Sequence, residues 1–254
     1  MYHTSTNNPA NNTLLTSNRL IVIIPALNEE DSIGLVLTHI PQELQAHVIV
    51  CDNASTDRTA IVAAEHGAIV VHEQERGYGA ACLRALEKAR EYKPEWVVFL
   101  DADYSDTPEE MLMLLEPLLS DKADLVIGSR RLGMGLGIVE PGALLPQARF
   151  GNWLATWLIR FIWGVRFTDL GPFRAITWKT LEFLNMQDRN FGWTVEMQVK
   201  AAQHHLRCME IPVSYRVRIG KSKITGTIKG TIKAGYKILW VIATSALQKH
   251  KHKN

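Results

Sequence analysis

The sequence has few cysteines and no apolar run long enough to cross a bilayer. Cys51, Cys82 and Cys208 lack the close spacing of metal ligands and are typical of reduced thiols in a cytoplasmic protein. The longest apolar run, Ile238–Ala243, is far shorter than the roughly 20 residues of a spanning helix. The N-terminus also lacks the charged-then-apolar pattern of a secretory signal. These absences predict a cytoplasmic protein.

The chain also has no large excess of positive or of negative charge. The 28 basic residues nearly balance the 26 acidic ones, so the overall charge gives no indication of nucleic-acid binding. The charge is nevertheless unevenly distributed, because the stretch from Arg216 to Lys253 contains neither Asp nor Glu. The C-terminal region is therefore a basic segment of a nearly neutral chain.

Apolar, β-branched runs alternate with helical spacing through the first half of the chain. This alternation predicts an α/β fold with a mostly parallel, doubly wound sheet. The predicted strands are Leu20–Ile24, His47–Cys51, Ala68–His72, Trp96–Leu100 and Asp124–Gly128. The predicted helices begin at Ile33, near Ser55–Asp57 (ending at Gly67), at Gly79, and at a capping box over Thr107–Glu110.

The second half predicts an aromatic helix from Phe150 to Trp163 and a strand within Arg207–Val217. Pro212 would place that strand at a sheet edge or a bulge. A last, amphipathic helix is expected from about Thr227. We expect residues 1–18 to be a disordered tail, 19–225 to be one domain, and 226–254 to be the C-terminal helix and basic tail.

Two carboxylates, Asp101 and Asp103, stand one residue apart at the end of the strand Trp96–Leu100. The chain leaves an open α/β sheet there, at the edge where such sheets bind ligands. Adjacent like charges repel, and a divalent cation that carries a nucleoside diphosphate would compensate them. Taken alone, the pair could also be ordinary solvated loop acids.

The neighbouring strand ends carry similar short polar segments. Pro25–Glu30 leaves the first strand and Asp52–Asp57 leaves the second, where a nucleobase can meet backbone groups and short side chains. Gly77 and Gly79 follow the third strand and precede a helix N-terminus, a natural place for phosphate or sugar hydroxyls. The G-x-G-x-x-G spacing after the first strand is missing, which argues against a nicotinamide dehydrogenase.

In order and spacing these segments resemble the family 2 glycosyltransferases, which have the GT-A fold. The chain is most similar to their dolichol-phosphate mannosyltransferase and polyprenyl-phosphate glycosyltransferase branch. The motifs that carry the resemblance are Pro25–Glu30, Asp52–Asp57, the Gly-Tyr-Gly turn, Asp101–Asp103, Gly128–Arg130, Thr168–Arg174, Gly192–Glu196 and Arg218–Lys223. It extends from about Leu20 to Leu239 and implies that 19–225 is a GT-A domain.

The resemblance implies a donor site and a metal site. Asp52 and the loop residues Pro25, Ala26, Asn28 and Glu29 would hold the base and ribose, together with Gly77, Gly79 and Ala102. Asp101 would contact the ribose or the metal, and Asp103 would bind Mg²⁺ or Mn²⁺ at the diphosphate. One departure concerns Ser105, which stands where the mannosyltransferases often have a metal-binding Gln, so a water could take that place.

Four residues are candidates for the chemistry: Asp103, Arg130, Asp169 and Glu196. Arg130 is suited to a diphosphate or acceptor phosphate, although a surface ion pair would also explain it. Asp169 and Arg174 could bind sugar or pair with each other. Glu196 could orient the sugar or act as a base. A lipid phosphate acceptor is already anionic and needs little base catalysis, whereas an alcohol requires a carboxylate such as Glu196 or Asp169.

The basic residues near the C-terminus suggest an acceptor phosphate and a membrane. Arg218, Lys221 and Lys223 form a cluster suited to the phosphate, with Arg130 as a further contact. Lys229, Lys233 and Lys237 recur on one face of the last helix, which also carries Trp240. Such a helix can lie on an anionic membrane, or it can pack on the domain.

The sequence therefore predicts an inverting, metal-dependent hexosyltransferase, with the inversion implied by the resemblance. The donor would be a nucleotide sugar of the GDP-mannose or UDP-glucose type, and the acceptor a polyprenyl or dolichyl phosphate. The enzyme would lie at the cytoplasmic face of the membrane and could hand its product to a membrane protein. The alternatives are a soluble or lipid alcohol acceptor, and a catalytically silent membrane-associated scaffold. A nucleotidyltransferase is disfavoured, because Pro25–Glu30 is not its Gly-rich, basic motif.

Overall fold

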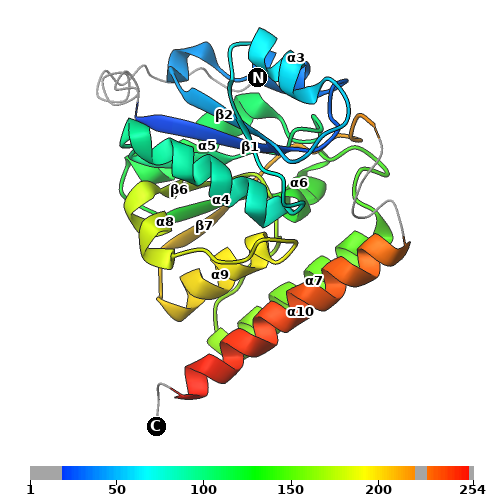
Figure 1. The fold of residues 1–254 in the computed structure, drawn as a ribbon. Helices are drawn as coiled ribbons and strands as arrows, with labels where there is room; N and C mark the ends of the chain where they lie inside the picture. Colours follow the sequence, from blue (N-terminus) through cyan, green and yellow to red (C-terminus); the bar gives the residue numbers. More distant parts are fainter. Residues whose placement is uncertain (1–18, 221–227, 252–254) are drawn as a thin grey trace.

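A computed structural model describes residues 19–220 and 228–251. Its strands form one seven-stranded sheet in the order β3-β2-β1-β4-β6-β5-β7 (Figure 1). They are β1 (Leu20–Ala26), β2 (His47–Asp52), β3 (Ile69–His72), β4 (Trp96–Phe99), β5 (Leu125–Ser129), β6 (Arg174–Thr177) and β7 (Cys208–Pro212). The α-helices are α2 (Ile33–Thr38), α3 (Thr59–Glu65), α4 (Tyr78–Ala89), α5 (Met111–Leu119), α6 (Arg130–Leu136), α7 (Pro146–Trp163), α8 (Trp178–Leu184), α9 (Trp193–Gln203) and α10 (Ile228–Lys251).

The direction of β6 decides which segments meet at the functional edge. All other neighbouring strands run parallel, but β6 runs antiparallel to β4 and β5. Arg174, the first residue of β6, is paired with Phe99 at the end of β4 and with Ile127 near the end of β5. The segment that enters β6 therefore lies at the carboxyl ends of the parallel strands.

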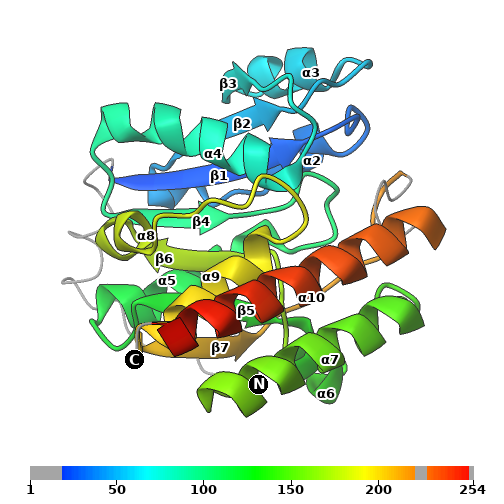
Figure 2. The same cartoon turned by 60° about the horizontal axis from the view of Figure 1, so that its bottom comes forward.

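The sheet is covered on both faces, and each face has its own apolar core. One core joins the sheet to α2, α3 and α5, and the other joins it to α4, α8 and α9. Helices α7 and α10 lie side by side as an outer layer (Figures 1 and 2). Val241 and Ile242 of α10 are buried, so the last helix packs on the domain.

Most of the predicted elements are confirmed. All six predicted strands are present, Pro212 lies in the edge strand β7, and Gly67 ends its helix with a φ of 81°. The capping box is wrong in detail: Thr107 makes no capping side-chain bond, and a 3₁₀ turn over Pro108–Glu110 precedes α5. The sequence did not predict β6, α6, α8 or α9.

Residues 1–18, expected to be a disordered tail, lie outside the described part of the chain. Within the described part, we find no helix with the length and apolar character needed to span a membrane.

Candidate functional site

A cleft of about 290 Å³ lies at the carboxyl ends of β1, β2 and β4. The residues that line it come from the loops after these strands, the start of α4, the loop before α9 and the segment after β7. They are Pro25, Ala26, Leu27, Glu29, Asn53, Arg76, Gly77, Tyr78, Ala81, Asp101, Ala102, Asp103, Asn190, Phe191 and Arg218. The strand-end segments singled out in the sequence thus face one cavity.

The loops after β1 and β2 are bonded to each other. Asn28 has a φ of 52°, its N–H donates to Ser55 Oγ at 3.0 Å, and its Oδ1 accepts the N–H of Thr56 at 2.7 Å. The N–H of Glu29 donates to Thr59 Oγ1 at 2.8 Å. Asn28 therefore holds the two loops in register instead of lining the cleft.

Asp52 ends β2 but is not among the residues that line the cleft. Its carboxylate lies 3.2 Å from His72 Nδ1 and accepts the N–H of Ser55 at 3.3 Å. The next residue, Asn53, lines the cleft, and its Oδ1 accepts the N–H of Gly77 at 2.8 Å. Asn53 therefore connects the β2 loop to the turn before α4.

The N-terminus of α4 is occupied by protein and not by an open anion site. The N–H groups of Gly79 and Ala80 donate to the carbonyls of Asn190 and Arg189, at 3.2 and 2.9 Å. A Cβ on Gly79 would lie 1.9 Å from the carbonyl oxygen of Asp188. The close approach of this loop requires a glycine at position 79. Gly79 is not among the residues that line the cleft, so a packing contact replaces the ligand contact predicted for it. Gly77 does line the cleft.

The acidic pair at the end of β4 places two carboxylates close enough for their charges to act on each other. Burial, followed by the charge of Asp103, raises the pKa of Asp101 to about 7, against the opposing effect of a hydrogen bond from Tyr78. The Tyr78 hydroxyl donates to Asp101 Oδ1 at 3.1 Å. On the other carboxylate, Ser105 Oγ donates to Asp103 Oδ1 at 2.5 Å. Ser105 therefore acts on Asp103 directly.

This pair fits a divalent cation that arrives with a diphosphate. Carboxylate oxygens suit Mg²⁺ and Mn²⁺, and a cation would offset both the burial and the charge of Asp103 that raise the pKa of Asp101. In the described part of the chain, no group of three or more His, Cys, Asp or Glu side chains could hold a metal ion. With two protein carboxylates as ligands, the remaining coordination positions of the metal ion would be filled by diphosphate and water oxygens.

Arg218 lies on the acidic side of the cleft. Its Nη1 is 3.1 Å from Asp103 Oδ2 and its Nη2 is 2.7 Å from Glu29 Oε1. The backbone supports this position, because the N–H of Ile219 donates to the carbonyl of Asp103 at 3.0 Å. The segment after β7 thus reaches the acidic pair. Lys221 and Lys223, predicted to join Arg218, lie outside the described residues.

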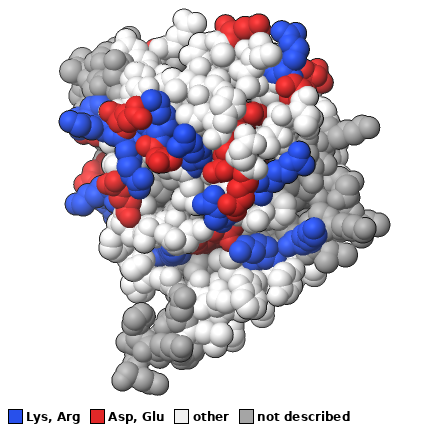
Figure 3. Space-filling model, in the orientation of Figure 1, with Lys and Arg blue, Asp and Glu red and all other residues white. Residues whose placement is uncertain are grey.

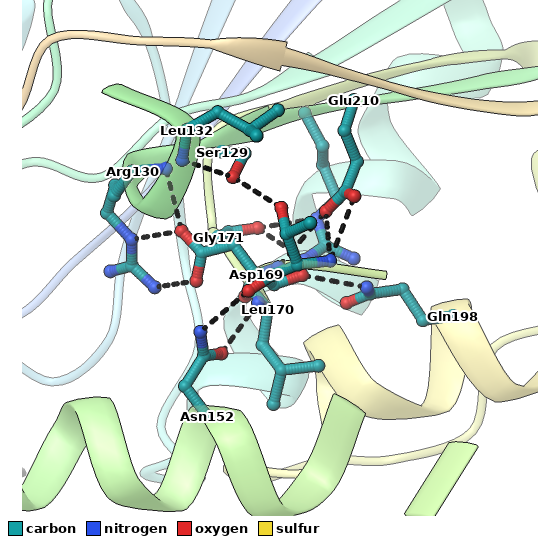
Figure 4. Close-up of polar contacts among 11 residues, drawn as sticks. Ser129, Arg130, Leu132, Asn152, Asp169, Leu170, Gly171, Gln198 and Glu210 are labelled. Carbon is teal, nitrogen blue, oxygen red and sulfur yellow. Dashed lines mark hydrogen bonds and ion pairs between the residues drawn. The ribbon is translucent and has the colours of Figure 1, made fainter. Parts of the chain in front are cut away.

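A second polar centre joins Arg130 and Asp169 (Figure 4). Asp169 is fully buried and accepts Nε and Nη2 of Arg130, both at 2.8 Å. The N–H of Arg130 also donates to Asp169 at 2.8 Å. Burial by itself raises the pKa of Asp169, but the charge and hydrogen bonds of Arg130 outweigh it and hold that pKa below its ordinary value. Asp169 is therefore an ionised partner of Arg130.

Three elements, β7, α7 and α9, hold the loop that carries Asp169. Glu210 of β7 accepts the N–H groups of Thr168 and Asp169, at 2.9 and 3.0 Å. Asn152 of α7 accepts the N–H of Leu170 at 2.7 Å, and Gln198 of α9 donates to the carbonyl of Asp169 at 2.9 Å (Figure 4). The loop is fixed from the helix layer and from the sheet.

Arg174 does not pair with Asp169, contrary to one of the sequence alternatives. Its guanidinium is fully buried and donates to the carbonyls of Gly171, Leu170 and Thr194. Burial lowers its pKa to about 10. Arg174 therefore shapes the turn from inside the protein.

Glu196 lies outside the cleft lining and is engaged by the loop before α9. Its carboxylate accepts the N–H groups of Gln187 and Asp188, at 2.9 and 2.7 Å, and pairs with Lys200 at 2.7 Å. These contacts hold the backbone of the loop before α9, and Glu196 itself is not among the residues that line the cleft.

Sequence reasoning missed several residues of the site. Tyr78 stands inside the predicted Gly-Tyr-Gly turn and Asn53 follows Asp52, so both were within motifs already singled out. Asn190 and Phe191 precede the Gly192–Glu196 motif, and no local signal placed them beside β4.

Asp106 is 1% exposed, and burial together with the charges of Asp101 and Asp103 raises its pKa well above the ordinary value.

Sequence comparison relates this chain to known glycosyltransferases. The sequence profile "Glycosyl transferase family 2" matches residues 21–140. An uncharacterized glycosyltransferase of Mycobacterium tuberculosis is 38% identical over 220 residues, which cover 86% of this chain and 95% of that protein. An undecaprenyl-phosphate mannosyltransferase of Micrococcus luteus is 30% identical over 224 residues, 84% of this chain and 90% of that protein.

Among solved structures, glucosyl-3-phosphoglycerate synthase from Mycobacterium tuberculosis, in complex with Mn²⁺, UDP-glucose and phosphoglyceric acid, matches with a TM-score of 0.70. The match covers 97% of this chain and 85% of that one at 20% identity. The shared architecture confirms the predicted GT-A fold. The extent and identity of the sequence matches show that the chain belongs to glycosyltransferase family 2.

Proposed function

We propose that this enzyme transfers a hexose from a nucleoside-diphosphate sugar to a polyprenyl phosphate, with inversion at the anomeric carbon. The donor base and ribose would lie against the Pro25–Glu29 loop, Asn53 and Gly77. Asp101 and Asp103 would hold Mg²⁺ or Mn²⁺, which when bound supplies positive charge to the departing diphosphate. Arg218 would stabilise the same developing charge from the protein side.

The contacts of the two candidate bases, Asp169 and Glu196, favour one class of acceptor. An alcohol acceptor requires a carboxylate that removes its proton, whereas a phosphate monoester is already anionic at neutral pH. Asp169 is fully buried against Arg130, and Glu196 is bonded to two backbone N–H groups and to Lys200. Both carboxylates are committed to contacts away from the cleft, which favours an acceptor that needs no base.

A second observation favours an acceptor held in a membrane. Helix α7 presents a stripe of aromatic side chains to solvent: Phe150, Trp153, Trp157 and Phe161, exposed by 63, 48, 49 and 76%. Tyr236 and Trp240 of the adjacent α10 are exposed by 66 and 52%. We call these six side chains the aromatic face. Aromatic rings at this density suit the interface between water and lipid.

The charge around the aromatic face is of one sign. From Pro141 to Phe167 the chain contains three arginines and no acid, and α10 contains lysines and no acid. In Figure 3 most of the Asp and Glu side chains lie in the upper half of the view, mixed with Lys and Arg, and the lower half is mainly uncharged where residues are described. A basic, aromatic surface is attracted to anionic lipid, so we place the enzyme peripherally at the cytoplasmic face of the membrane.

The decisive experiment is product formation by the purified protein with Mg²⁺ or Mn²⁺ and radiolabelled GDP-mannose or UDP-glucose. The expected result is label in the lipid phase only when a polyprenyl phosphate is present. Transfer to a polyprenol, or to phosphoglycerate, would reject the acceptor proposed here and keep the enzyme class. Binding of nucleotide without any transfer would favour a silent, membrane-associated scaffold.

A further inference from the structure

The loop between α8 and α9, residues 185–192, forms one wall of the donor cleft. Asn190 and Phe191 line the cavity. The carbonyls of Arg189 and Asn190 accept the first N–H groups of α4, and a Cβ on Gly77 would lie 2.1 Å from the carbonyl oxygen of Arg189. The loop and the start of α4 are therefore packed as one unit, and a shift of the loop would move both sides of the cleft.

Asp188 fixes the conformation of this loop. Its Oδ1 accepts the N–H groups of Asn190 and Gly192, at 2.7 and 3.0 Å. Its own N–H donates to Glu196 of α9 at 2.7 Å. The Asp188 side chain is 4% exposed, so its charge is withdrawn from water and requires compensation from within the protein.

The compensating charge comes from the C-terminal helix. Lys237 of α10 places Nζ 2.8 Å from Asp188 Oδ2. Val241, one turn further along α10, also packs here, because a Cβ on Gly192 would lie 2.8 Å from its Cγ2. The sequence places Lys237 on the same helix face as Lys229 and Lys233 and leaves open what that face meets; in the structure Lys237 is half-buried against Asp188, whereas Lys233 is exposed.

Other contacts of the loop do not replace this pair. Arg189 pairs with Glu75 at 2.8 Å, but both side chains are about half exposed, and exposed pairs stabilise little. The Asp188 side chain is 4% exposed, although Lys237 is 35% exposed, so loss of Lys237 leaves a desolvated carboxylate without its cation, which is unfavourable. Without Lys237, Asp188 would turn toward water and release the N–H groups that shape Asn190 and Phe191.

We propose that Lys237 is a positioning residue for the donor site, acting through Asp188 on the cleft wall. The inference rests on the proposed function in one respect: the cleft binds a nucleoside diphosphate. Through this pair, the helix that carries Tyr236 and Trp240 of the aromatic face also helps to shape the donor cleft.

The test is titration of the full-length protein with GDP and with UDP, each with Mg²⁺, in lipid-free buffer. We expect Lys237→Ala to raise the Kd of the preferred nucleotide about tenfold. The Lys237→Arg variant, which keeps the charge, should restore binding. Lys233→Ala, one turn earlier and exposed, is the matched control and should bind like the wild type. With active enzyme, the donor KM should rise more than kcat falls.

Hydrogen exchange of the same proteins gives a readout that needs no nucleotide. Lys237→Ala should speed exchange at the amides of Gly79, Ala80, Asn190 and Gly192, while thermal unfolding shows that the variant remains folded. Unchanged exchange and affinity in a folded Lys237→Ala protein would overturn the inference. If the wild type bound neither nucleotide, the proposed function would fail, and the exchange data would still decide the role of Lys237.

Discussion

Arg218 lies 3.1 Å from Asp103, so the carboxylate expected to bind the metal has a cationic partner within the protein. A guanidinium and a divalent ion compete for the same oxygens. A bound diphosphate would change this balance, because it offers phosphate oxygens both to the metal and to the arginine.

The first prediction follows from this competition. The Arg218→Ala variant should bind free Mn²⁺ more tightly than the wild type, by about fivefold, because an opposing cation is removed. It should bind the metal–nucleotide complex more weakly, because a phosphate contact is lost. Electron paramagnetic resonance of Mn²⁺, with and without GDP or UDP, measures both. Arg58→Ala, an exposed arginine outside the cleft, is the control, and weaker binding of free Mn²⁺ by Arg218→Ala would contradict the competition.

The acidic pair should be indispensable for transfer. Groups that only orient metal ligands contribute about 10- to 100-fold, so loss of a direct ligand in Asp101→Asn or Asp103→Asn should exceed about 100-fold. Label transfer gives the rate, and Mn²⁺ affinity shows whether the metal is lost with it. A variant that kept wild-type transfer would remove that aspartate from the metal site.

Asp169→Asn tests the buried pair with Arg130. The variant leaves a desolvated guanidinium, which should lower the free energy of unfolding by about 3 kcal/mol. The folded pKa of Asp169 lies below its ordinary value, so its stabilising effect is complete above about pH 4 and is lost as the pH falls toward the folded pKa.

The measurement is urea unfolding between pH 7 and pH 3. The wild type should lose more stability over this interval than Asp169→Asn does. Parallel acid dependence in the two proteins would show that the pKa of Asp169 is not depressed by folding.

The aromatic face should bind lipid. Replacing Trp157 or Phe161 by Ala should weaken partition to anionic vesicles by about 1 kcal/mol each, since 49% of Trp157 and 76% of Phe161 are exposed and available for burial. Cosedimentation with phosphatidylglycerol vesicles measures this. Phe183 of α8 is equally exposed, at 58%, but lies outside this face, so Phe183→Ala should not change the partition. An equal loss in Phe183→Ala would refute a specific face.

Two glycines provide a matched pair for backbone approach. Gly79→Ala should destabilise the protein by about 1–3 kcal/mol, because its Cβ would meet the carbonyl of Asp188. Gly135 of α6 has no atom within 4 Å of its Cβ position, so Gly135→Ala should leave stability unchanged or raise it by up to about 1 kcal/mol. The unfolding temperatures of the two variants separate the steric clash expected in Gly79→Ala from the gain in helix propensity expected in Gly135→Ala.

The side of the cleft formed by the loops after β1, β2 and β4 was largely predictable from sequence. β1, β2 and β4 are apolar runs, and the polar residues that follow them meet at one sheet edge for geometric reasons. The other side depends on contacts distant in sequence. Arg130 and Asp169 are 39 residues apart, and no local pattern indicates their pairing.

Prediction failed where the local sequence pattern did not indicate the surroundings that a residue has in the fold. β6 is four residues long and begins with Arg174, a charged residue that is fully buried, so it lacks the apolar signature of a strand. Gly79 was assigned to a ligand because glycine permits any close approach, and in this fold it is protein backbone that approaches. Lys237 follows a helical repeat with Lys233, yet their surroundings differ because α10 packs on the loop before α9.

The reversed strand β6 divides the sheet into two parallel groups, β3-β2-β1-β4 and β5-β7. Every residue proposed to read the nucleotide base follows a strand of the first group or starts the helix after it. The Arg130–Asp169 pair and the segment that carries Arg218 are attached to the second group and to β6. The residues proposed to read the base and the Arg130–Asp169 pair therefore lie on opposite sides of β6, and Arg218, which pairs with Glu29 and Asp103, connects the two sides.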